Sequence, residues 1–324
     1  MVMIDVQNLR KDFIVSKKKK GLRGAFVDLI KPEKEIFHAV DDISFQLEKG
    51  EIVGYLGPNG AGKSTTVKIM CGILQPTSGS VMINGLSPAA NRKEVVSKLG
   101  VVFGQRTQLF WDLRLGESFE LLKRIYRIDD NLYQTNLKLM DDVLQINEII
   151  DKPVRQLSLG QRMRGDLVAS MLHSPEILFL DEPTIGLDVE AKYSIRKFIK
   201  EINQNFGTTV ILTTHDLDDV EQLCSRIIII NHGKIIEDGP LEMLIDRIAP
   251  YRYLIVDFYK LPEEINHPEI EVMKKENTRV WLRFEKNKTS AAKLISDLSL
   301  RYQIRDLSVE ETKIEDVVRQ VYKS

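Results

Sequence analysis

The nine residues GPNGAGKST, at Gly57–Thr65, constrain the fold of this chain more than any other stretch. They fit the pattern G-x-x-x-x-G-K-[ST], which indicates a phosphate loop only between a strand and a helix. The preceding EIVGYLG has the continuous apolar character of a buried strand, and the following TTVKIMCGIL has apolar residues at helical spacing. The sequence therefore predicts a loop that cradles phosphate groups at the N-terminus of a helix.

The residue types of this loop suit phosphate binding. Three glycines allow the backbone to turn and to approach a ligand closely, while exposed amides and the positive end of the helix dipole face the anion. We expect Lys63 to reach the β- and γ-phosphates of a nucleotide and Ser64 to hold Mg²⁺. The predicted nucleotide-binding residues of the loop are Gly57, Pro58, Asn59, Gly60, Ala61, Gly62, Lys63, Ser64 and Thr65.

A second motif, PEILFLDEPT, occupies Pro175–Thr184. Its apolar run ends in two adjacent carboxylates, as expected of a buried parallel strand with charge at its C-terminal tip. Asp181 is placed to bind Mg²⁺ through water, and Glu182 alternates to the other face, where it can polarise an attacking water. Two carboxylates at a strand end are often only part of a solvated loop. The phosphate loop upstream favours the functional interpretation.

A third motif is TTVILTTHDLDD, at Thr208–Asp219, a β-rich run followed by His215. A single histidine after a strand is more often structural than catalytic. Its place after a phosphate loop and an Asp-Glu strand changes that expectation. At such a strand end, His215 can donate a hydrogen bond to a γ-phosphate and sense its loss.

The order of these motifs resembles the nucleotide-binding subunit of ATP-binding cassette (ABC) transporters over roughly Met3–Leu244. The resemblance implies an α/β P-loop NTPase cassette, in which a RecA-like core carries antiparallel β and helical subdomains. It also implies a Mg²⁺-dependent ATP hydrolase in which Glu182 and His215 are catalytic. IGLD, at Ile185–Asp188, resembles the D-loop of the family, which assigns a role to Asp188.

Two further site residues follow from the same resemblance. The glutamine that the family brings to the metal corresponds to Gln105 in VVFGQRTQLFWDL, with Gln108 as a second choice; the metal set is then Ser64, Gln105 and Asp181. The aromatic residue that stacks on adenine corresponds to Phe13, at the end of VQNLRKDF. Phe37 is an alternative. A phenylalanine is more often simply buried in the core, which is the competing interpretation for both residues.

LSLGQ, at Leu157–Gln161, has no acid or base for catalysis but resembles the family signature, commonly LSGGQ. In this family the signature contacts the ATP that the other subunit holds, so a hydroxyl and helix N-terminal amides suffice. Two copies, or one copy and a paralogous subunit, would then sandwich two ATP molecules. Leu159 replaces the first glycine, which affects fine geometry rather than the role. The signature residues are Ser158, Leu159, Gly160 and Gln161.

We expect an ATPase domain over residues 1–245 and a small α+β accessory domain over 246–324, where period-two strands alternate with helical patterns. Within the first domain, residues 106–165 read as a helical subdomain. An insertion at about 16–37 carries a basic run, which is either a solvated loop or a contact with a membrane surface or permease. Leu109, Phe110 and Trp111 either form a socket for a permease helix or pack under their own subdomain.

Composition restricts the partners. A net charge of -1 provides no overall attraction to nucleic acid, so no nucleic-acid partner is expected. Cys71 and Cys224 lie in apolar helical patterns and predict two buried thiols rather than a disulfide. The start of the chain lacks the features of a secretory signal, and no apolar run approaches the roughly 20 residues that span a bilayer.

The resemblance therefore implies a cytoplasmic subunit, peripheral on the inner face of the membrane, that powers a separate transmembrane permease. PTIGLD, the GLRGAF insertion and the short C-terminal tail resemble the exporter branch that pairs with six-helix permeases of the ABC-2 type. The rival is a non-transport ABC ATPase that acts on ribosomes or DNA. One phosphate loop, one signature and no sustained heptads between them disfavour that rival.

Overall fold

The computed structural model describes residues 1–16, 34–104, 106–312 and 314–322 of the chain. It divides into two compact units, Met1–Asp238 and Gly239–Ser324. The division precedes the expected boundary at 245/246 because helix α9, Leu241–Ile248, packs against helix α11, Ile314–Val321, in the second unit.

A six-stranded sheet forms the centre of the first unit, and its carboxyl strand ends position the site. Adjacent strands β5, β6, β7, β3 and β8 run parallel, and their nearly continuous burial explains their apolar sequences. In spatial order the strands are β5 Leu99–Phe103, β6 Ile177–Asp181, β7 Thr209–Thr213, β3 Ile52–Leu56, β8 Arg226–Asn231 and β9 Lys234–Pro240.

Helices follow the strands of this sheet, as the resemblance to a RecA-like α/β core implies. Helix α7 has its buried residues on one face, at Ile195, Phe198, Ile199 and Ile202, and packs against β7 and α8. The helices that connect these strands are α2 Lys63–Met70, α3 Arg92–Val96, α6 Leu159–Met171, α7 Val189–Phe206 and α8 Leu217–Leu223.

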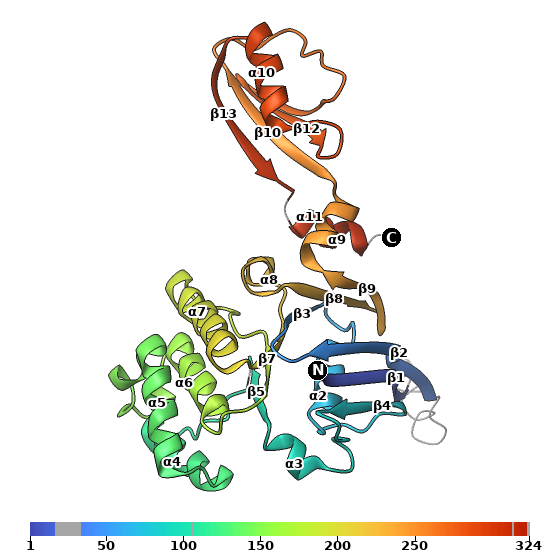
Figure 1. The fold of residues 1–324 in the computed structure, drawn as a ribbon. Coiled ribbons are helices and arrows are strands. Elements are labelled where there is room, and N and C mark those ends of the chain that lie inside the picture. The colour runs from blue at the N-terminus through green and yellow to red at the C-terminus, as the bar shows by residue number, and fades with distance from the viewer. Residues whose placement is uncertain (17–33, 105, 313, 323–324) are drawn as a thin grey trace, which may run out of the picture. The chain divides into compact units, whose positions relative to one another are not determined.

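The helical region comprises α4, Leu115–Tyr126, and α5, Asp130–Leu144, which pack against α6 (Figure 1). Two short 3₁₀ helices, η1 Ile146–Glu148 and η2 Val154–Gln156, lead from α5 to α6. Helix α5 begins where the Asp129 carboxylate accepts bonds from the first amides. Helix α6 continues to Met171, beyond the expected end of the subdomain at residue 165.

A three-stranded antiparallel sheet, in the order β2-β1-β4, lies beside the central sheet (Figure 1). Its strands are β1 Val2–Ser16, β2 Lys34–Glu48 and β4 Ser78–Ile83. The expected insertion at 16–37 is therefore shorter at both ends, because Ser16 and residues 34–37 belong to strands. Its basic run, and residues 17–33 as a whole, lie outside the described residues.

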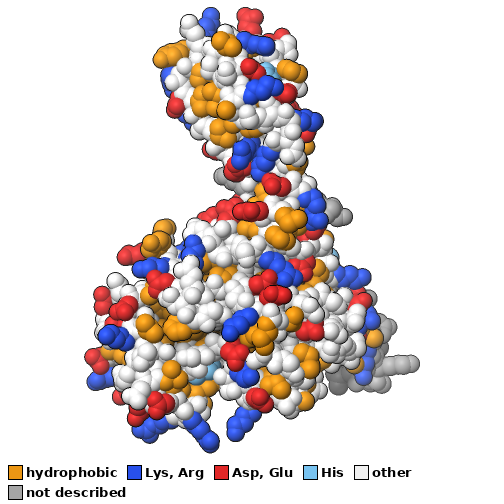
Figure 2. Space-filling view, viewed as in Figure 1, with side chains coloured by type: hydrophobic (Ala, Val, Ile, Leu, Met, Phe, Trp, Pro, Cys, Tyr) orange, Lys and Arg blue, Asp and Glu red, His pale blue; other side chains and the backbone are white. Residues whose placement is uncertain are grey.

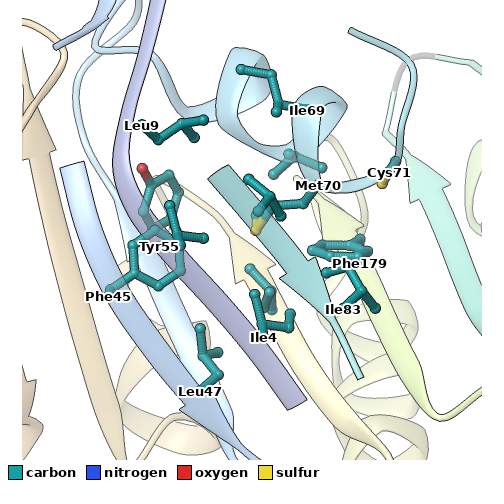
Figure 3. Close-up of a cluster of buried hydrophobic side chains, with 14 of the residues drawn as sticks. Ile4, Leu9, Phe45, Leu47, Tyr55, Ile69, Met70, Cys71, Ile83 and Phe179 are labelled. Atoms are coloured by element: carbon teal, nitrogen blue, oxygen red, sulfur yellow. The ribbon is translucent and has the colours of Figure 1, made fainter. Parts of the chain in front are cut away.

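One hydrophobic core joins the antiparallel sheet to the phosphate-loop helix. Figure 3 shows Ile4, Phe45 and Ile83 of the antiparallel strands gathered with Met70 of α2 and Phe179 of β6. This packing fixes α2 against both sheets. Cys71 belongs to the same core, and Cys224 is also a buried free thiol, as predicted. Burial raises the pKa of each thiol to about 12.

The second unit contains a four-stranded antiparallel sheet in the order β11-β12-β10-β13. Alternate residues of β10 and β12 pack on Leu294 and Leu298 of helix α10, Ala291–Arg301. The sequence pattern did not indicate β11, because all six of its residues are exposed and no apolar alternation marks an edge strand. The strands are β10 Tyr251–Phe258, β11 Glu271–Glu276, β12 Arg279–Glu285 and β13 Ile304–Glu311.

Within the described part of the chain, no helix has the length and apolar character needed to cross a membrane. On the visible face of the first unit, hydrophobic side chains form small groups between charges of both signs (Figure 2).

Candidate functional site

The GPNGAGKST loop connects β3 to α2, and two of its three glycines, Gly57 and Gly62, lie against neighbouring backbone. A Cβ at Gly57 would lie 2.4 Å from the Ile230 carbonyl oxygen, and one at Gly62 would lie 2.4 Å from that of Ala39. Gly62 also has a φ of 109°, a conformation that side-chain-bearing residues rarely adopt. The loop is thus confined between β8 and β2, and helix α2 begins directly after it.

The loop borders an open cleft of about 570 Å³. Two larger surface hollows, of about 750 and 650 Å³, contain none of the predicted site residues that the structure describes. The predicted site residues that line the 570 Å³ cleft are Phe13, Asn59, Gly60, Gly62, Lys63, Ser64, Thr65, Asp181 and Glu182. Phe103 and Arg106, which the sequence patterns did not indicate, line it as well.

The Lys63 side chain folds over the loop. Its ammonium group donates hydrogen bonds to the carbonyl oxygens of Gly57, at 2.5 Å, and Pro58, at 3.1 Å. Burial lowers the pKa of Lys63, while the charges of Glu182 and Asp181 act in the opposite direction. A buried cation with only carbonyl ligands gains from a nearby anion, as a phosphate-binding lysine should.

Hydroxyl and carboxylate oxygens converge beside Lys63. The Ser64 hydroxyl donates to Asp181 Oδ2 at 3.4 Å, and the Thr213 hydroxyl donates to Asp181 Oδ1. Asp181 and Thr213 are direct partners in the parallel pairing of β6 and β7. Sequence reasoning did not give Thr213 a role, although its place at the strand end before His215 was visible.

These oxygens fit Mg²⁺ in chemistry, because Mg²⁺ prefers hard oxygen ligands. Among the described residues, no group of three or more His, Cys, Asp and Glu side chains could hold a metal ion by itself.

Glu182 and His215 meet where β6 and β7 end. Glu182 Oε1 lies 3.2 Å from His215 Nδ1, and the Glu182 amide donates to the Thr213 carbonyl at 2.8 Å. Glu182 has a φ of 54°, in the left-handed region that few residues of its type adopt. The turn separates its side chain from that of Asp181, so the two carboxylates have different neighbours.

Both aromatic candidates stand at the cleft. Phe13 of β1 and Phe37 of β2 are directly paired across the antiparallel ladder, and both rings are partly exposed. The Lys11 ammonium lies 5.2 Å from the centroid of the Phe13 ring. The pairing leaves both rings available to a flat ligand.

Of the two glutamine candidates, Gln105 lies outside the described residues. Gln108 makes its hydrogen bonds to Asp166 instead. Its side-chain amide donates to the Asp166 backbone carbonyl at 2.9 Å, and its backbone amide donates to the Asp166 carboxylate at 3.0 Å. Thr107 also donates to that carboxylate, at 2.9 Å. The buried Asp166 of α6 therefore anchors the loop that follows Gln105, a role that sequence reasoning missed.

Ser158 is the N-cap of helix α6. Its hydroxyl accepts a hydrogen bond from the Gln161 amide at 3.2 Å, and the Gln161 side chain accepts one from the Ser158 amide at 3.1 Å. This reciprocal pair is a capping box, which a serine and a glutamine three residues later can form. None of the described residues that line the cleft comes from Ser158–Gln161.

The signature and the D-loop contact each other within the chain. Asp188 is the N-cap of α7 and accepts a hydrogen bond from the Ala191 amide at 2.8 Å. A Cβ at Gly160 would lie 3.2 Å from Ala191 Cβ, and one at Gly186 would lie 3.3 Å from Leu159 Cδ2. The unusual Leu159 thus packs over the D-loop glycine, which has room for it because Gly186 has no side chain.

We expect Asp166→Asn to change how stability depends on pH. Burial raises the pKa of Asp166 to about 6 from 3.8, against hydrogen bonds from Gln108 and Thr107. The folded state therefore binds this proton more tightly than the unfolded state does. The stability gained in this way is fully present below pH 3.8 and is lost as the pH rises to about 6. The variant has no such loss, so its free energy of unfolding relative to that of the wild type should rise by about 3 kcal/mol across the interval. Urea unfolding measured along a pH series tests this, and a constant difference between variant and wild type would contradict it.

The chain is similar to proteins of one family. The family model described as ABC transporter matches residues 40–185. The ABC transporter ATP-binding protein NatA of Bacillus subtilis is 30% identical over 212 residues, which cover 65% of this chain and 86% of NatA. The methionine import ATP-binding protein MetN of Latilactobacillus sakei is 29% identical over 297 residues, 88% of this chain and 85% of MetN.

A solved structure shows the same cassette fold. It is a dimeric ATP-binding cassette in a post-hydrolysis state with ADP and Pi, 26% identical, with a TM-score of 0.61 over 74% of this chain and 99% of that one. The chain therefore belongs to the family of ABC transporter ATP-binding proteins, and its cassette is an ATP hydrolase.

Proposed function

We propose that this cleft binds ATP with Mg²⁺ and hydrolyses it to drive a separate transmembrane permease. The observation that supports this most strongly is the convergence of three strand ends. The phosphate loop after β3 supplies Lys63 and Ser64, the Asp181–Glu182 pair at the end of β6 lies beside them, and His215 after β7 contacts Glu182.

In this proposal, the phosphate loop binds the anionic end of the nucleotide. The amides at the start of α2 face the phosphates, and Lys63 exchanges its carbonyl partners for the β- and γ-phosphate oxygens. Ser64 and Asp181 would hold Mg²⁺ together with Gln105, and the ion would neutralise charge on the phosphates. Phe13 stacks on the adenine, with Phe37 as the neighbouring alternative.

Glu182 and His215 divide the remaining chemistry. Glu182 is the group that orients and polarises the attacking water, because its carboxylate contacts His215 and not the hydroxyls that donate to Asp181. His215 Nδ1 now lies 3.2 Å from Glu182 Oε1. If the His215 side chain moves away from Glu182, it can donate a hydrogen bond to the γ-phosphate instead. The His215 side chain is 63% exposed and the Glu182 side chain is 23% exposed, which leaves both accessible to a nucleotide.

We also propose that a second subunit completes the site. The signature Ser158–Gln161 is absent from the described lining of the cleft, and its serine caps an exposed helix start. A partner copy, or a paralogous subunit, would place this helix N-terminus against the γ-phosphate. Asp188, at the start of α7, lies on the same side as the signature and would face the partner.

The permease surface that we propose lies on the loop before α4. Phe110 and Trp111 are 38% and 52% exposed, and the Arg162 guanidinium lies 5.4 Å from the Trp111 ring centroid. Leu109, expected with them, is 4% exposed and packs within the subdomain instead, so only two of the three residues remain available. For the partner we propose a six-helix ABC-2 type permease acting in export. The support for this branch is the PTIGLD and GLRGAF sequences.

Two substitutions separate nucleotide binding from hydrolysis. Glu182→Gln should preserve ATP affinity and lower the turnover at least about 100-fold, because the carboxylate acts on the water and not on the phosphates. Lys63→Ala should instead weaken ATP binding, since it removes a charge from the phosphate site. Titration with a fluorescent ATP analogue and a phosphate-release assay measure the two effects. Unchanged binding in Lys63→Ala, or full turnover in Glu182→Gln, would contradict the assignment.

The permease proposal predicts where the chain is found in cells. Trp111→Ala should reduce the fraction bound to washed membranes about 10-fold, because exposed aromatic anchors dominate many protein interfaces. Phe206→Ala, at the half-exposed end of α7, is the matched control and should remain bound. Mass spectrometry of the detergent-solubilised complex identifies the permease and its spans. A partner without six spans would overturn the ABC-2 assignment, and sedimentation with ribosomes would favour the rival function.

A further inference from the structure

A buried polar network lies behind the proposed catalytic pair. At its centre is Asp219 of helix α8, whose side chain is 0% exposed. Asp219 Oδ2 accepts hydrogen bonds from the Thr184 hydroxyl and, at 3.4 Å, from the Thr214 hydroxyl. Its other oxygen, Oδ1, accepts a bond from Arg196 Nε at 2.6 Å. Both oxygens of this carboxylate therefore accept hydrogen bonds.

The two threonines belong to the loops that carry the proposed catalytic residues. Thr184 comes two residues after Glu182, and Thr214 immediately precedes His215. Both threonines are at most 3% exposed. A single carboxylate thus holds the two loops at a fixed separation, on the side away from the cleft.

The cation that neutralises Asp219 comes from helix α7. Arg196 also lies 3.8 Å from Asp216, the N-cap of α8, and Lys192, one turn earlier on α7, lies 2.5 Å from the same carboxylate. Burial raises the pKa of Asp216, but its bond to Lys192 and the charges of Lys192 and Arg196 lower it overall. Two cations on one face of α7 therefore pair with two carboxylates of α8.

Helix α7 begins at Asp188, the D-loop residue that our proposal places against the second subunit. We infer that Asp219 and Arg196 are positioning residues, which transmit the position of α7 to Glu182 and His215. Closure of the two subunits would press on the start of α7, and the ion pairs would pass this displacement to both catalytic loops. This inference rests on the proposed sandwich and on the proposed roles of Glu182 and His215.

The network permits substitutions that break one connection at a time. Asp219→Asn has one oxygen that can still accept from the threonines, but its amide group cannot accept from Arg196, so the connection to α7 is lost. Thr184→Val keeps the shape and removes only the bond from the Glu182 loop. We expect each variant to lower kcat about 10- to 100-fold, as small displacements of a catalytic group do, and to change the KM for ATP less than about threefold.

A double-mutant cycle tests whether both residues act through one connection. In Thr184→Val/Asp219→Asn, kcat should fall little below that of the more impaired single variant, because the first change already interrupts the path. Arg196→Lys, which keeps the charge but loses the planar fork, should retain more turnover than Arg196→Met.

Two controls have matched chemistry. Thr312→Val removes a buried hydroxyl, which donates to the Tyr251 carbonyl at 2.7 Å in the second unit. Lys197→Met removes a cation of α7 whose partner, Glu201, lies on the same helix at 3.8 Å. Both controls should keep kcat within about twofold, since neither touches the loops of Glu182 or His215. Thermal unfolding of every variant separates a loss of turnover from a loss of folded protein.

Three results would overturn the inference: an unchanged kcat in Thr184→Val and Asp219→Asn, a KM that rises as much as kcat falls, or effects on kcat that multiply in the double variant. Failure of the proposed function is distinguishable from these. If Glu182→Gln kept full turnover, the catalytic assignment itself would be wrong. If Glu182→Gln lost turnover and Asp219→Asn did not, only the network inference would be wrong.

Discussion

The close backbone packing that fixes the start of helix α2 is the constraint on which the rest of the site depends. Gly57 leaves no space for a side chain against Ile230 of β8, and Gly62 leaves none against Ala39 of β2. The two sheets therefore hold the phosphate loop from both sides, and the first residues of α2 line the cleft. Only with that helix start in place do Lys63 and Ser64 face the carboxylates at the end of β6.

Asp181, the last residue of β6, and Glu182, which follows it, have different hydrogen-bond partners. Asp181 accepts hydroxyl bonds from Ser64 and Thr213, which suits an oxygen ligand of a hydrated cation. Glu182 turns away through a left-handed backbone conformation and meets His215 instead. Thr184 and Thr214, in the loops of the proposed catalytic residues, both donate to the buried carboxylate of Asp219, so these loops are held by this carboxylate as well as by the strands.

Local patterns predicted most of this arrangement because they carry their own physical signal. The glycine spacing of the phosphate loop and the apolar strands with charged tips each follow from a few adjacent residues. Contacts between distant segments were not predictable in this way. Nothing near Asp219 or Asp166 distinguishes it from a solvated acid until the fold brings Arg196 or Thr107 beside it. Likewise, β11 is fully exposed and carries no apolar alternation, so only its pairing with β12 identifies it.

The central claim is that one chain provides only part of a complete ATP site, and mixing two inactive variants tests it most directly. Ser158→Arg should leave ATP binding by the monomer intact and prevent hydrolysis, because the added side chain does not fit between two closing subunits. Lys63→Ala lacks the phosphate-binding charge. A heterodimer of the two has one site with both elements intact, so the mixture should hydrolyse ATP faster than either variant alone. Loss of ATP binding by the Ser158→Arg monomer, with no recovery on mixing, would show that the signature acts within its own chain and would contradict the account.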